Sequence, residues 1–507
     1  MILGNILIWF VIIPLIMLAG LGLCTNRGMG AIRTVMTVCS SVLLVLAIWL
    51  VCEFIGFRAG GNTDEMLFTG SWMWYEPLNI HLAIGVDGIS VFMILLSAVI
   101  VFAGTFASWK INPLPKNFFL WFSLLSMGVF GFFISIDIFT MFMFYEIALI
   151  PMYLLIGVWG TGRKEYSAMK LTLMLMGGSA FLMLGLFGIY WHSAADTQNL
   201  TWNILEIAHN NSISKEWQMF LFPLTFVGFG VLGAMFPFHT WSPDGHASAP
   251  TAVSMLHAGV LMKLGGYGCF RIAIYLLPAA AQELAWIFII LTGISIVYGA
   301  FSACVQTDLK YINAYSSVSH CGMVLFAILM LNTTAMTGAI LQMLSHGLMT
   351  ALFFALIGMI YGRTHTRDIR QMGGLMKIMP YLGVCYMIAG FASLGLPGLS
   401  GFVAEMTIFF GSFQHADIFH RCFVIAATCS IVITAVYILR VVGKLLLGKV
   451  QDEHHLSLTD ATWFERLSTV TLIVCIAGIG CFPNWISEAI SVSFKPIMEA
   501  LATVTPM

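Results

Sequence analysis

Long, continuous apolar runs separated by short polar segments dominate the pattern of this chain. Each run is about 20 residues long, which is the length that an α-helix needs to cross the hydrocarbon core of a bilayer. Because the apolar residues are continuous and do not alternate with polar ones, the pattern favours helices over a membrane β-barrel. It predicts an all-α polytopic membrane protein of about fourteen helices, beginning near residues 2, 33, 85, 117, 136, 170, 217, 251, 284, 311, 335, 378, 420 and 467.

The longer polar interruptions fall at about 57–84, 192–216 and 448–466. None is long enough to hold a soluble domain, so we expect a single membrane domain over residues 1–507. No basic segment precedes the N-terminal apolar run, which indicates a first membrane span and not a cleaved signal peptide.

Composition narrows the class of protein further. Hydrophobic residues make up 60% of the chain and charged residues only 9%, which excludes a soluble globular protein. The 22 Lys and Arg against 23 Asp and Glu leave no basic field, which excludes a nucleic-acid binder. The 11 cysteines form no CxxC pair, and neither a P-loop nor a GxGxxG after a strand is present. We therefore expect no metal and no cofactor in this chain.

The charges between the apolar runs predict the orientation. Of the 22 basic residues, 15 fall on one side of the predicted bundle, with Lys170 and Lys310 counted among them, and five on the other, with Arg271 among those. The remaining two, Lys263 and Arg440, lie inside apolar runs. Because cytoplasmic loops carry the excess of basic residues, we expect loop 363–377 in the cytoplasm and both termini outside.

Five ionisable residues lie inside apolar runs, where such a group costs about 2.5–3.5 kcal/mol at the centre of the bilayer. They come from five different predicted helices and are Glu146, Lys263, Glu405, His320 and His346. Carboxylates, histidines and a lysine at one depth suit proton transfer, because burial can bring each of them close to neutrality at pH 7. The alternative for each is a structural role, either a buried pair that fixes helix register or a side chain that reaches the interface.

Two further residues are weaker candidates. Asp137 stands nine residues before Glu146, about 14 Å along a helix, and is expected to mark the outer edge of the membrane. His257 stands six residues before Lys263, about 120° around the helix, so these two side chains do not share a face.

Two of the predicted helices are interrupted. The seventh apolar run contains Pro237, Pro243 and Pro250, and the twelfth breaks at Gly395–Gly401 around Pro397. Two broken helices five spans apart are typical of a transporter built from two inverted five-helix repeats, with simple proline kinks as the alternative. Glu405, close to the second break, favours a break that lines a polar cavity.

These residues lie in long segments that resemble the proton-translocating antiporter-like subunits of respiratory complex I. The resemblance is greatest to subunit M of NADH-quinone oxidoreductase, which corresponds to chain 4 of the mitochondrial enzyme. Subunit L carries a further long lateral helix, for which this sequence has no counterpart after the fourteenth span. The matching segments are FYEIALIPMYLLIGVWG, FPFHTWSPDGHASAPTAVSMLHAGVLMKLGGYGCFR, QTDLKYINAYSSVSHCGMVLFAI, QMLSHGLMTALFFALIGMIYGRTHTRDIRQMGGL and SLGLPGLSGFVAEMTIFFGSF.

The resemblance implies fourteen helices with inverted repeats at 117–275 and 284–447, and proton transfer along a central polar axis. It also implies quinone reduction elsewhere in the complex, the antiporter-like L and N subunits as neighbours, and a bacterial cytoplasmic (inner) membrane. The residues that it matches are Glu146 on the fifth helix, His239 on the seventh, Lys263 on the eighth, Glu405 on the twelfth, and His320 and His346 as bridging members of the axis.

The chain departs from the family at one place. The family has a lysine on the seventh helix that pairs with the fifth-helix glutamate, but position 232 here is Leu, and Ala234 replaces a nearby proline. We therefore expect Glu146 to be protonated more readily than in relatives that keep the lysine. His257 resembles a histidine of subunit L and is a candidate substitute relay.

Three alternatives stay open at this point. The first two are a subunit of a multisubunit Na⁺/H⁺ antiporter and a subunit of a membrane-bound hydrogenase. The third is a coupling subunit that does not pump, which Leu232 favours.

Overall fold

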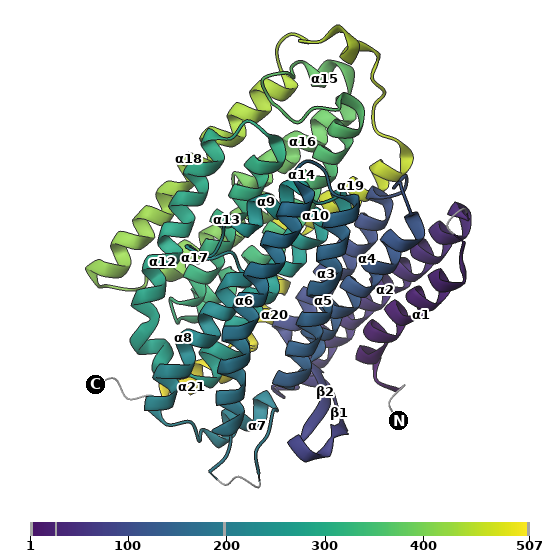
Figure 1. Cartoon of the computed structure of the whole chain (residues 1–507). Coiled ribbons are helices and arrows are strands. Elements are labelled where there is room, and N and C mark those ends of the chain that lie inside the picture. Colours follow the sequence, from purple (N-terminus) through teal and green to yellow (C-terminus); the bar gives the residue numbers. More distant parts are fainter. Residues whose placement is uncertain (1–3, 26–27, 196–198, 504–507) are drawn as a thin grey trace.

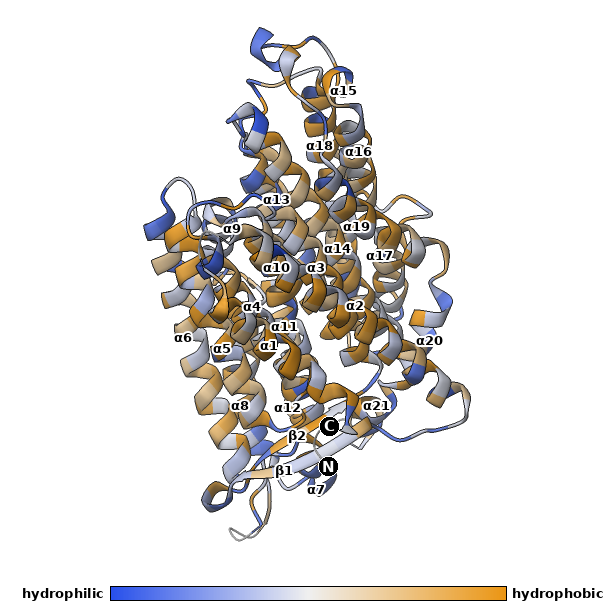
Figure 2. Cartoon of the chain, turned by 90° about the vertical axis from the view of Figure 1, so that its right-hand side faces the viewer, coloured by the Kyte–Doolittle hydropathy of each residue, from blue (hydrophilic) through white to orange (hydrophobic). Residues whose placement is uncertain are grey.

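The computed structural model describes residues 4–25, 28–195 and 199–503, which form a bundle of long helices (Figure 1). Apolar residues cover the middle of the bundle and polar ones gather at its two ends (Figure 2). Ten helices in the described residues are long and apolar enough to cross a membrane. They are α1 (Trp9–Leu23, preceded by the turn η2, Ile6–Ile8), α2 (Met29–Ala59), α3 (Gly88–Ala107), α4 (Pro115–Ile134), α5 (Ile138–Trp159), α6 (Lys164–Trp191), α12 (Pro278–Val305), α14 (Thr333–Thr364), α18 (Ile418–Leu446) and α19 (Trp463–Cys481).

Shorter or interrupted helices complete the bundle. Those inside it are α8 (Lys215–Leu232), α9 (Trp241–Ser248), α10 (Thr251–Leu256), α11 (Met262–Gly268), α13 (Leu309–Ile328), α16 (Pro380–Ser393) and α17 (Ser400–Ser412), with the π-helical turns η4 (His257–Leu261) and η5 (Cys269–Ile274) before and after α11. Those at its ends are α7 (Ile204–Asn210), α15 (Leu375–Ile378), η6 (Glu453–Ser457), α20 (Asn484–Val492) and α21 (Lys495–Ala502). The prediction of a polytopic helical membrane protein is confirmed.

A small β element lies in the predicted polar interruption at 57–84, where the apolar pattern indicated none. Strands β1 (Leu67–Tyr75) and β2 (Ile80–Val86) form an antiparallel hairpin around the turn η3 (Glu76–Leu78). The hairpin lies at the end of the bundle where α1 begins and α21 ends, and α15 lies at the opposite end (Figure 1). We call these the hairpin end and the α15 end.

Both predicted interruptions are present. Residues 233–240 separate α8 from α9, and residues 394–399 separate α16 from α17. Gly395 and Gly398 adopt positive φ angles of 64° and 91°, which a residue with a Cβ rarely adopts. Since the chain leaves the helical conformation for several residues, these are true breaks and not proline kinks.

The 32-residue α14 is the centre of the bundle. Its apolar stretch is 94% buried within the chain, against 28% for α19 at the periphery. Helices α3, α10, α13, α16, α17 and α19 pack around it, together with the turn η4. A side chain at mid-height on α14 is therefore remote from lipid.

Two glycines let α14 approach η4 closely. A Cβ added at Gly347 would lie 2.6 Å from the carbonyl oxygen of Gly259, and one added at Gly259 would lie 2.5 Å from Ile100 Cδ1. The 2.6 Å contact is with backbone and is shorter than atoms tolerate, so the crossing of α14 and η4 needs glycine at position 347, whereas the close neighbour of Gly259 is a side chain of α3.

We expect Gly347→Ala to destabilise the protein by about 1–3 kcal/mol, because the added methyl group has no room between two packed helices. The measurement is the unfolding temperature of the purified protein in detergent. Gly362→Ala on the same helix is the control, since a Cβ there meets nothing within 4 Å. Equal unfolding temperatures for the two variants would contradict the proposed close packing.

Candidate functional site

Four buried ionisable side chains form a row through the centre of the bundle, which we call the central row. Its members are Lys263 on α11, His346 on α14, His320 on α13 and Glu405 on α17. Lys263 Nζ lies 2.6 Å from His346 Nδ1, the rings of His346 and His320 are 5.3 Å apart between centroids, and His320 Nδ1 lies 3.6 Å from Glu405 Oε1. None of the four is more than 5% exposed. Four of the five predicted mid-membrane residues are thus neighbours.

Lys263 lacks an acidic partner within 4.0 Å among the described residues. Its ammonium donates to His346 and to the carbonyl oxygen of Ala258, which stands five residues earlier in η4. A neutral imidazole and a carbonyl are both acceptors without a full charge. The proton on Lys263 is therefore held only by neutral groups.

The middle of the row contains unpaired ring nitrogens. Nε2 of His320 and Nε2 of His346 are buried and have no hydrogen-bond partner among the residues that the structure describes. His320 Nδ1 lies 2.9 Å from the amide nitrogen of Gln342, one turn before His346 on α14. Buried polar atoms of this kind are usually satisfied by water, so the row suits a chain of protons carried through water.

A small cavity beside Lys263 adds to this picture. It has a volume of about 10 Å³ and lies among Gly233, Gly266, Cys321 and Met343. A space of this size is near the minimum for a single water molecule. Gly233 is the C-cap of α8, so the cavity adjoins the first helix break.

The second break holds the other end of the row. A Cβ added at Gly395 would lie 2.8 Å from Glu405 Oε2, so the carboxylate rests against the non-helical segment between α16 and α17. The hydroxyl groups of Ser345 and Ser400, 2.8 Å apart, hold α14 against the start of α17. Both ends of the row thus lie at a helix break.

Glu146 is not part of the central row. It lies half-buried on α5, and its Oε1 has no hydrogen-bond partner among the described residues. No described cation lies within 4.0 Å of its carboxylate, and Leu232, which ends α8, is 1% exposed. The structure thus offers no direct replacement for the lysine that the sequence lacks.

The three weaker candidates also lie outside the row. Asp137 caps α5 at the hairpin end, accepting a hydrogen bond from Thr140 N at 2.9 Å, and burial raises the pKa of its carboxyl to about 6. His239 is buried in the first break beside the ring of Tyr298, 5.0 Å away between centroids. Neither position brings a side chain into contact with the row.

His257 has a neighbour that the sequence did not single out. Its ring lies 4.3 Å from that of His246 on α9, and both side chains are fully buried. Both ring nitrogens of His257 lack a partner among the described residues. Periodicity could not mark His246, because it lies beyond the break in its helix, and only the tertiary fold brings it to His257.

Three basic residues that the sequence predicts in loops lie in helices, two of them buried in the bundle and Lys170 half-buried. Lys310 is 4% exposed and donates to the carbonyl oxygen of Ala249 at 2.6 Å. Lys170 on α6 pairs with Asp244 at 2.7 Å, and Arg271 in η5 pairs with Asp87. The prediction that they lie in loops was wrong, because the apolar pattern does not show which polar residues pack against a neighbouring helix.

A family model described as NADH:quinone oxidoreductase/Mrp antiporter, transmembrane, matches residues 135–434. NADH-quinone oxidoreductase subunit M of Rickettsia prowazekii is 35% identical over 461 residues, which cover 90% of this chain and 91% of that protein. NAD(P)H-quinone oxidoreductase chain 4 of Trichormus variabilis is 33% identical and covers 92% and 85%.

Solved structures agree on the fold. A chain of respiratory complex I from Thermus thermophilus superposes with a TM-score of 0.87 at 22% identity, covering 98% of this chain and 99% of the other. A chain of the Mrp complex from Dietzia sp. has a TM-score of 0.78 at 17% identity, covering 99% and 100%. This chain belongs to the NADH:quinone oxidoreductase/Mrp antiporter transmembrane family, where its relatives include the subunit M and chain 4 proteins.

Proposed function

We propose that this chain is a proton-translocating membrane subunit of an NADH:quinone oxidoreductase and moves H⁺ along the central row. The observation that carries the proposal is the continuity of the row from Lys263 to Glu405 through two histidines. Quinone reduction takes place on other subunits, and this chain works without a cofactor of its own. Its neighbours are the antiporter-like L and N subunits.

Transfer along the row proceeds in three steps. Lys263 donates to Nδ1 of His346 across 2.6 Å, which leaves an amine on Lys263 and an imidazolium on His346. His346 then releases its Nε2 proton through water to His320, since no direct hydrogen bond joins the two rings in the described part of the chain. His320 passes a proton to Glu405, where the 3.6 Å gap exceeds a hydrogen bond and needs a small movement or a water.

The number of spans follows from the interrupted helices. We infer that α8–α9, α10–η5, α13 and α16–α17 cross the membrane along with the ten long helices, which makes fourteen. In the repeats at 117–275 and 284–447, the broken helices α8–α9 and α16–α17 then occupy the fourth place of each. Corresponding breaks in two halves support inverted repeats.

We propose that the hairpin end faces outward and that the α15 end faces the cytoplasm of a bacterial cell. Removing Lys170, Lys310 and Arg271 from the loop count leaves the imbalance toward the α15 end in place. An even number of spans also fits the start of α1 and the end of α21 on the same side (Figure 1).

Among the alternatives, the Na⁺/H⁺ antiporter subunit draws support from the likeness to the Mrp complex. Hard cations prefer several oxygen ligands, whereas the central row offers one carboxylate and three nitrogen groups. The row therefore favours H⁺ as the transported ion. Genes adjacent to this one would separate the antiporter and hydrogenase alternatives, because partner subunits are usually encoded together.

We expect Lys263→Ala and Glu405→Gln each to lower the number of protons moved per NADH oxidised, because each removes one link of the same route. The double variant should lose no more than either single variant, as for residues that act as a unit. Proton uptake and NADH oxidation would be measured together in inverted membrane vesicles. Lys444→Ala and Glu453→Gln, both exposed, are the matched controls. An unchanged proton yield would contradict the proposal and favour the non-pumping coupling subunit.

Glu146 should be neutral in a larger fraction of molecules than in a variant that restores its cation. Leu232→Lys places an ammonium where the family has one, and a nearby cation favours the charged carboxylate. Infrared difference spectroscopy across a pH titration would follow the carbonyl band of the protonated acid, assigned by its loss in Glu146→Gln. If Leu232→Lys left the titration of that band unchanged, the two side chains would not interact.

We propose that His257 takes over the relay function of the missing lysine. The contact with His246 supports this role, because two buried imidazoles with ring centroids 4.3 Å apart can exchange a proton through one water. His257→Leu should then lower the proton yield in the natural chain but much less in a Leu232→Lys background. Equal losses in the two backgrounds would show that His257 does not substitute for that lysine.

A further inference from the structure

A stripe of polar side chains leads away from the central row toward the hairpin end. Lys263, Tyr267, Arg271 and Tyr275 follow one another at intervals of four residues through α11 and η5. Four residues of α-helix rise about 6 Å, so Tyr267 lies about 6 Å from Lys263 along the axis, and the π-helical turn η5 continues the stripe to Arg271 and Tyr275. None of the four is more than 4% exposed. The stripe thus places buried polar groups between Lys263 and the hairpin end without including Glu405.

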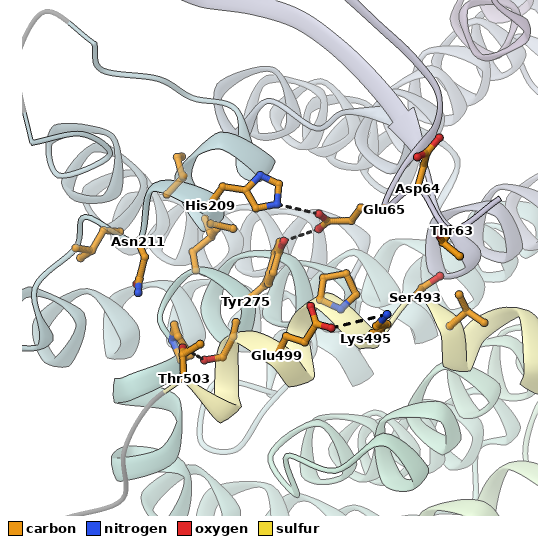
Figure 3. Close-up of a pocket in the computed structure, with 18 of the residues that line it drawn as sticks. Thr63, Asp64, Glu65, His209, Asn211, Tyr275, Ser493, Lys495, Glu499 and Thr503 are labelled. Carbon is orange, nitrogen blue, oxygen red and sulfur yellow. Dashed lines mark hydrogen bonds and ion pairs between the residues drawn. The ribbon is translucent and has the colours of Figure 1, made fainter.

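The far end of the stripe opens into a pocket of about 500 Å³ at the hairpin end (Figure 3). Its walls are the segment before β1, the end of α7, the start of α12, and α21. Tyr275 donates a hydrogen bond to Glu65, whose other oxygen lies 3.5 Å from Nε2 of His209. The His209 side chain is 71% exposed, so these groups connect Tyr275 with the aqueous surface.

One ion pair interrupts the stripe halfway. Arg271 pairs with Asp87, the N-cap of α3, and its Nε donates to the hydroxyl of Tyr267 at 3.3 Å. A guanidinium does not release its proton in proteins, so Arg271 cannot hand one on. Asp87 Oδ1 accepts hydrogen bonds from Ile89 N and Ser90 N, and its other oxygen faces Arg271. One oxygen of the carboxylate thus accepts hydrogen bonds at the start of α3, and the other is held in the ion pair with Arg271.

Aromatic rings close the space around the same point. Phe132 and Phe133 pack against the Tyr267 ring at 5.7 and 5.2 Å between centroids, largely edge-on. Arg271 and Asp87 are 2% and 1% exposed. A fixed cation in a narrow, water-poor passage also repels hydronium, as in water channels that exclude protons.

We propose that the Arg271–Asp87 pair is a proton seal that keeps Lys263 separated from the pocket at the hairpin end. Without it, protons on the central row would reach that end directly through Tyr267, Tyr275 and Glu65. The gradient would then discharge through the same subunit. This inference rests on the proposed function of Lys263, but its test needs no pumping.

The test measures passive proton flow through the whole complex in proteoliposomes, with a pH gradient imposed and no electron donor present. Arg271→Gln combined with Asp87→Asn removes both charges, so neither is left unpaired, and asparagine still caps α3. We expect the gradient to collapse several-fold faster than with the natural protein. NADH:quinone electron transfer in the same vesicles reports that the complex is assembled.

The control is a second buried ion pair that lies off the stripe. Arg363 and Glu465 are 2.7 Å apart at the α15 end, and Arg363→Gln with Glu465→Gln should leave the gradient intact. Adding Tyr275→Phe to the leaking variant should slow the leak, because it removes the link to Glu65. If the Arg271/Asp87 double variant kept the pH gradient as long as the natural protein, the proposal of a proton seal would be wrong. The proposal would also be wrong if Tyr275→Phe left the rate of the proton leak unchanged.

Discussion

Unpaired carbonyl groups at the ends of helices are the constraint on which the rest of this structure depends. The last turn of a helix leaves carbonyl oxygens without an intrahelical partner and carries a partial negative charge. Inside or beside a bilayer, water is not freely available to satisfy them. In this chain, basic side chains from other segments donate to these oxygens where helices end at the α15 end. The pairs are Lys116 with Gly22 at the end of α1, Arg33 with Trp109 after α3, Lys164 with Val158 at the end of α5, Arg367 with Ala247 and Lys310 with Ala249 at the end of α9, and Arg440 with Gln306 after α12.

These contacts are a second physical reason why basic residues are more numerous at the α15 end than at the hairpin end. The positive-inside rule relates basic residues to the orientation of the whole chain, but many of them here also terminate particular helices. The break after α8 requires such groups, because α9 is a short helix whose end lies within the bundle. Lys310 and Arg367 satisfy that end, and both residues come from segments that are distant in sequence from α9.

Lys263, in the centre of the bundle, also donates a hydrogen bond to a backbone carbonyl oxygen, but the effect on its proton is different. Its ammonium also donates to a backbone carbonyl, that of Ala258 in the π-helical turn η4. A cation satisfied by a carbonyl has no counter-ion that would fix its proton, as a carboxylate would. The imidazole of His346 can therefore compete for that proton. By contrast, Arg271 is held by the carboxylate of Asp87, and its proton stays in place. The same segment thus carries a lysine without a carboxylate partner among the described residues and, eight residues later, an arginine that is held by one.

The sequence predicted the parts of this arrangement that follow from local rules. Pro237 and the segment around Gly395 marked the two breaks, and the cost of a charge in lipid marked Lys263 and Glu405. Contacts between distant segments were not predictable. The Lys263–His346 pair spans 83 residues, and the His246–His257 pair forms only because α9 folds back beyond the break. The hairpin was missed because residues 57–84 interrupt the apolar pattern, which says little about a short two-stranded element at the surface.

The two halves of the protein contribute unequal numbers of residues to the central row, and the first half has Leu232 where the family resemblance predicts a lysine. The second half supplies His320, His346 and Glu405, whereas the first supplies Lys263 alone. Oε1 of Glu146 on α5 has no hydrogen-bond partner among the described residues. Under the proposed function, a proton that enters through the first half reaches Lys263 past Leu232, where the family resemblance predicts a lysine. His246 and His257 are buried and adjacent, and Nδ1 of His246 and both ring nitrogens of His257 have no hydrogen-bond partner among the described residues. If they carry the proton, loss of the lysine changes the chemistry of the inlet and leaves the row itself intact.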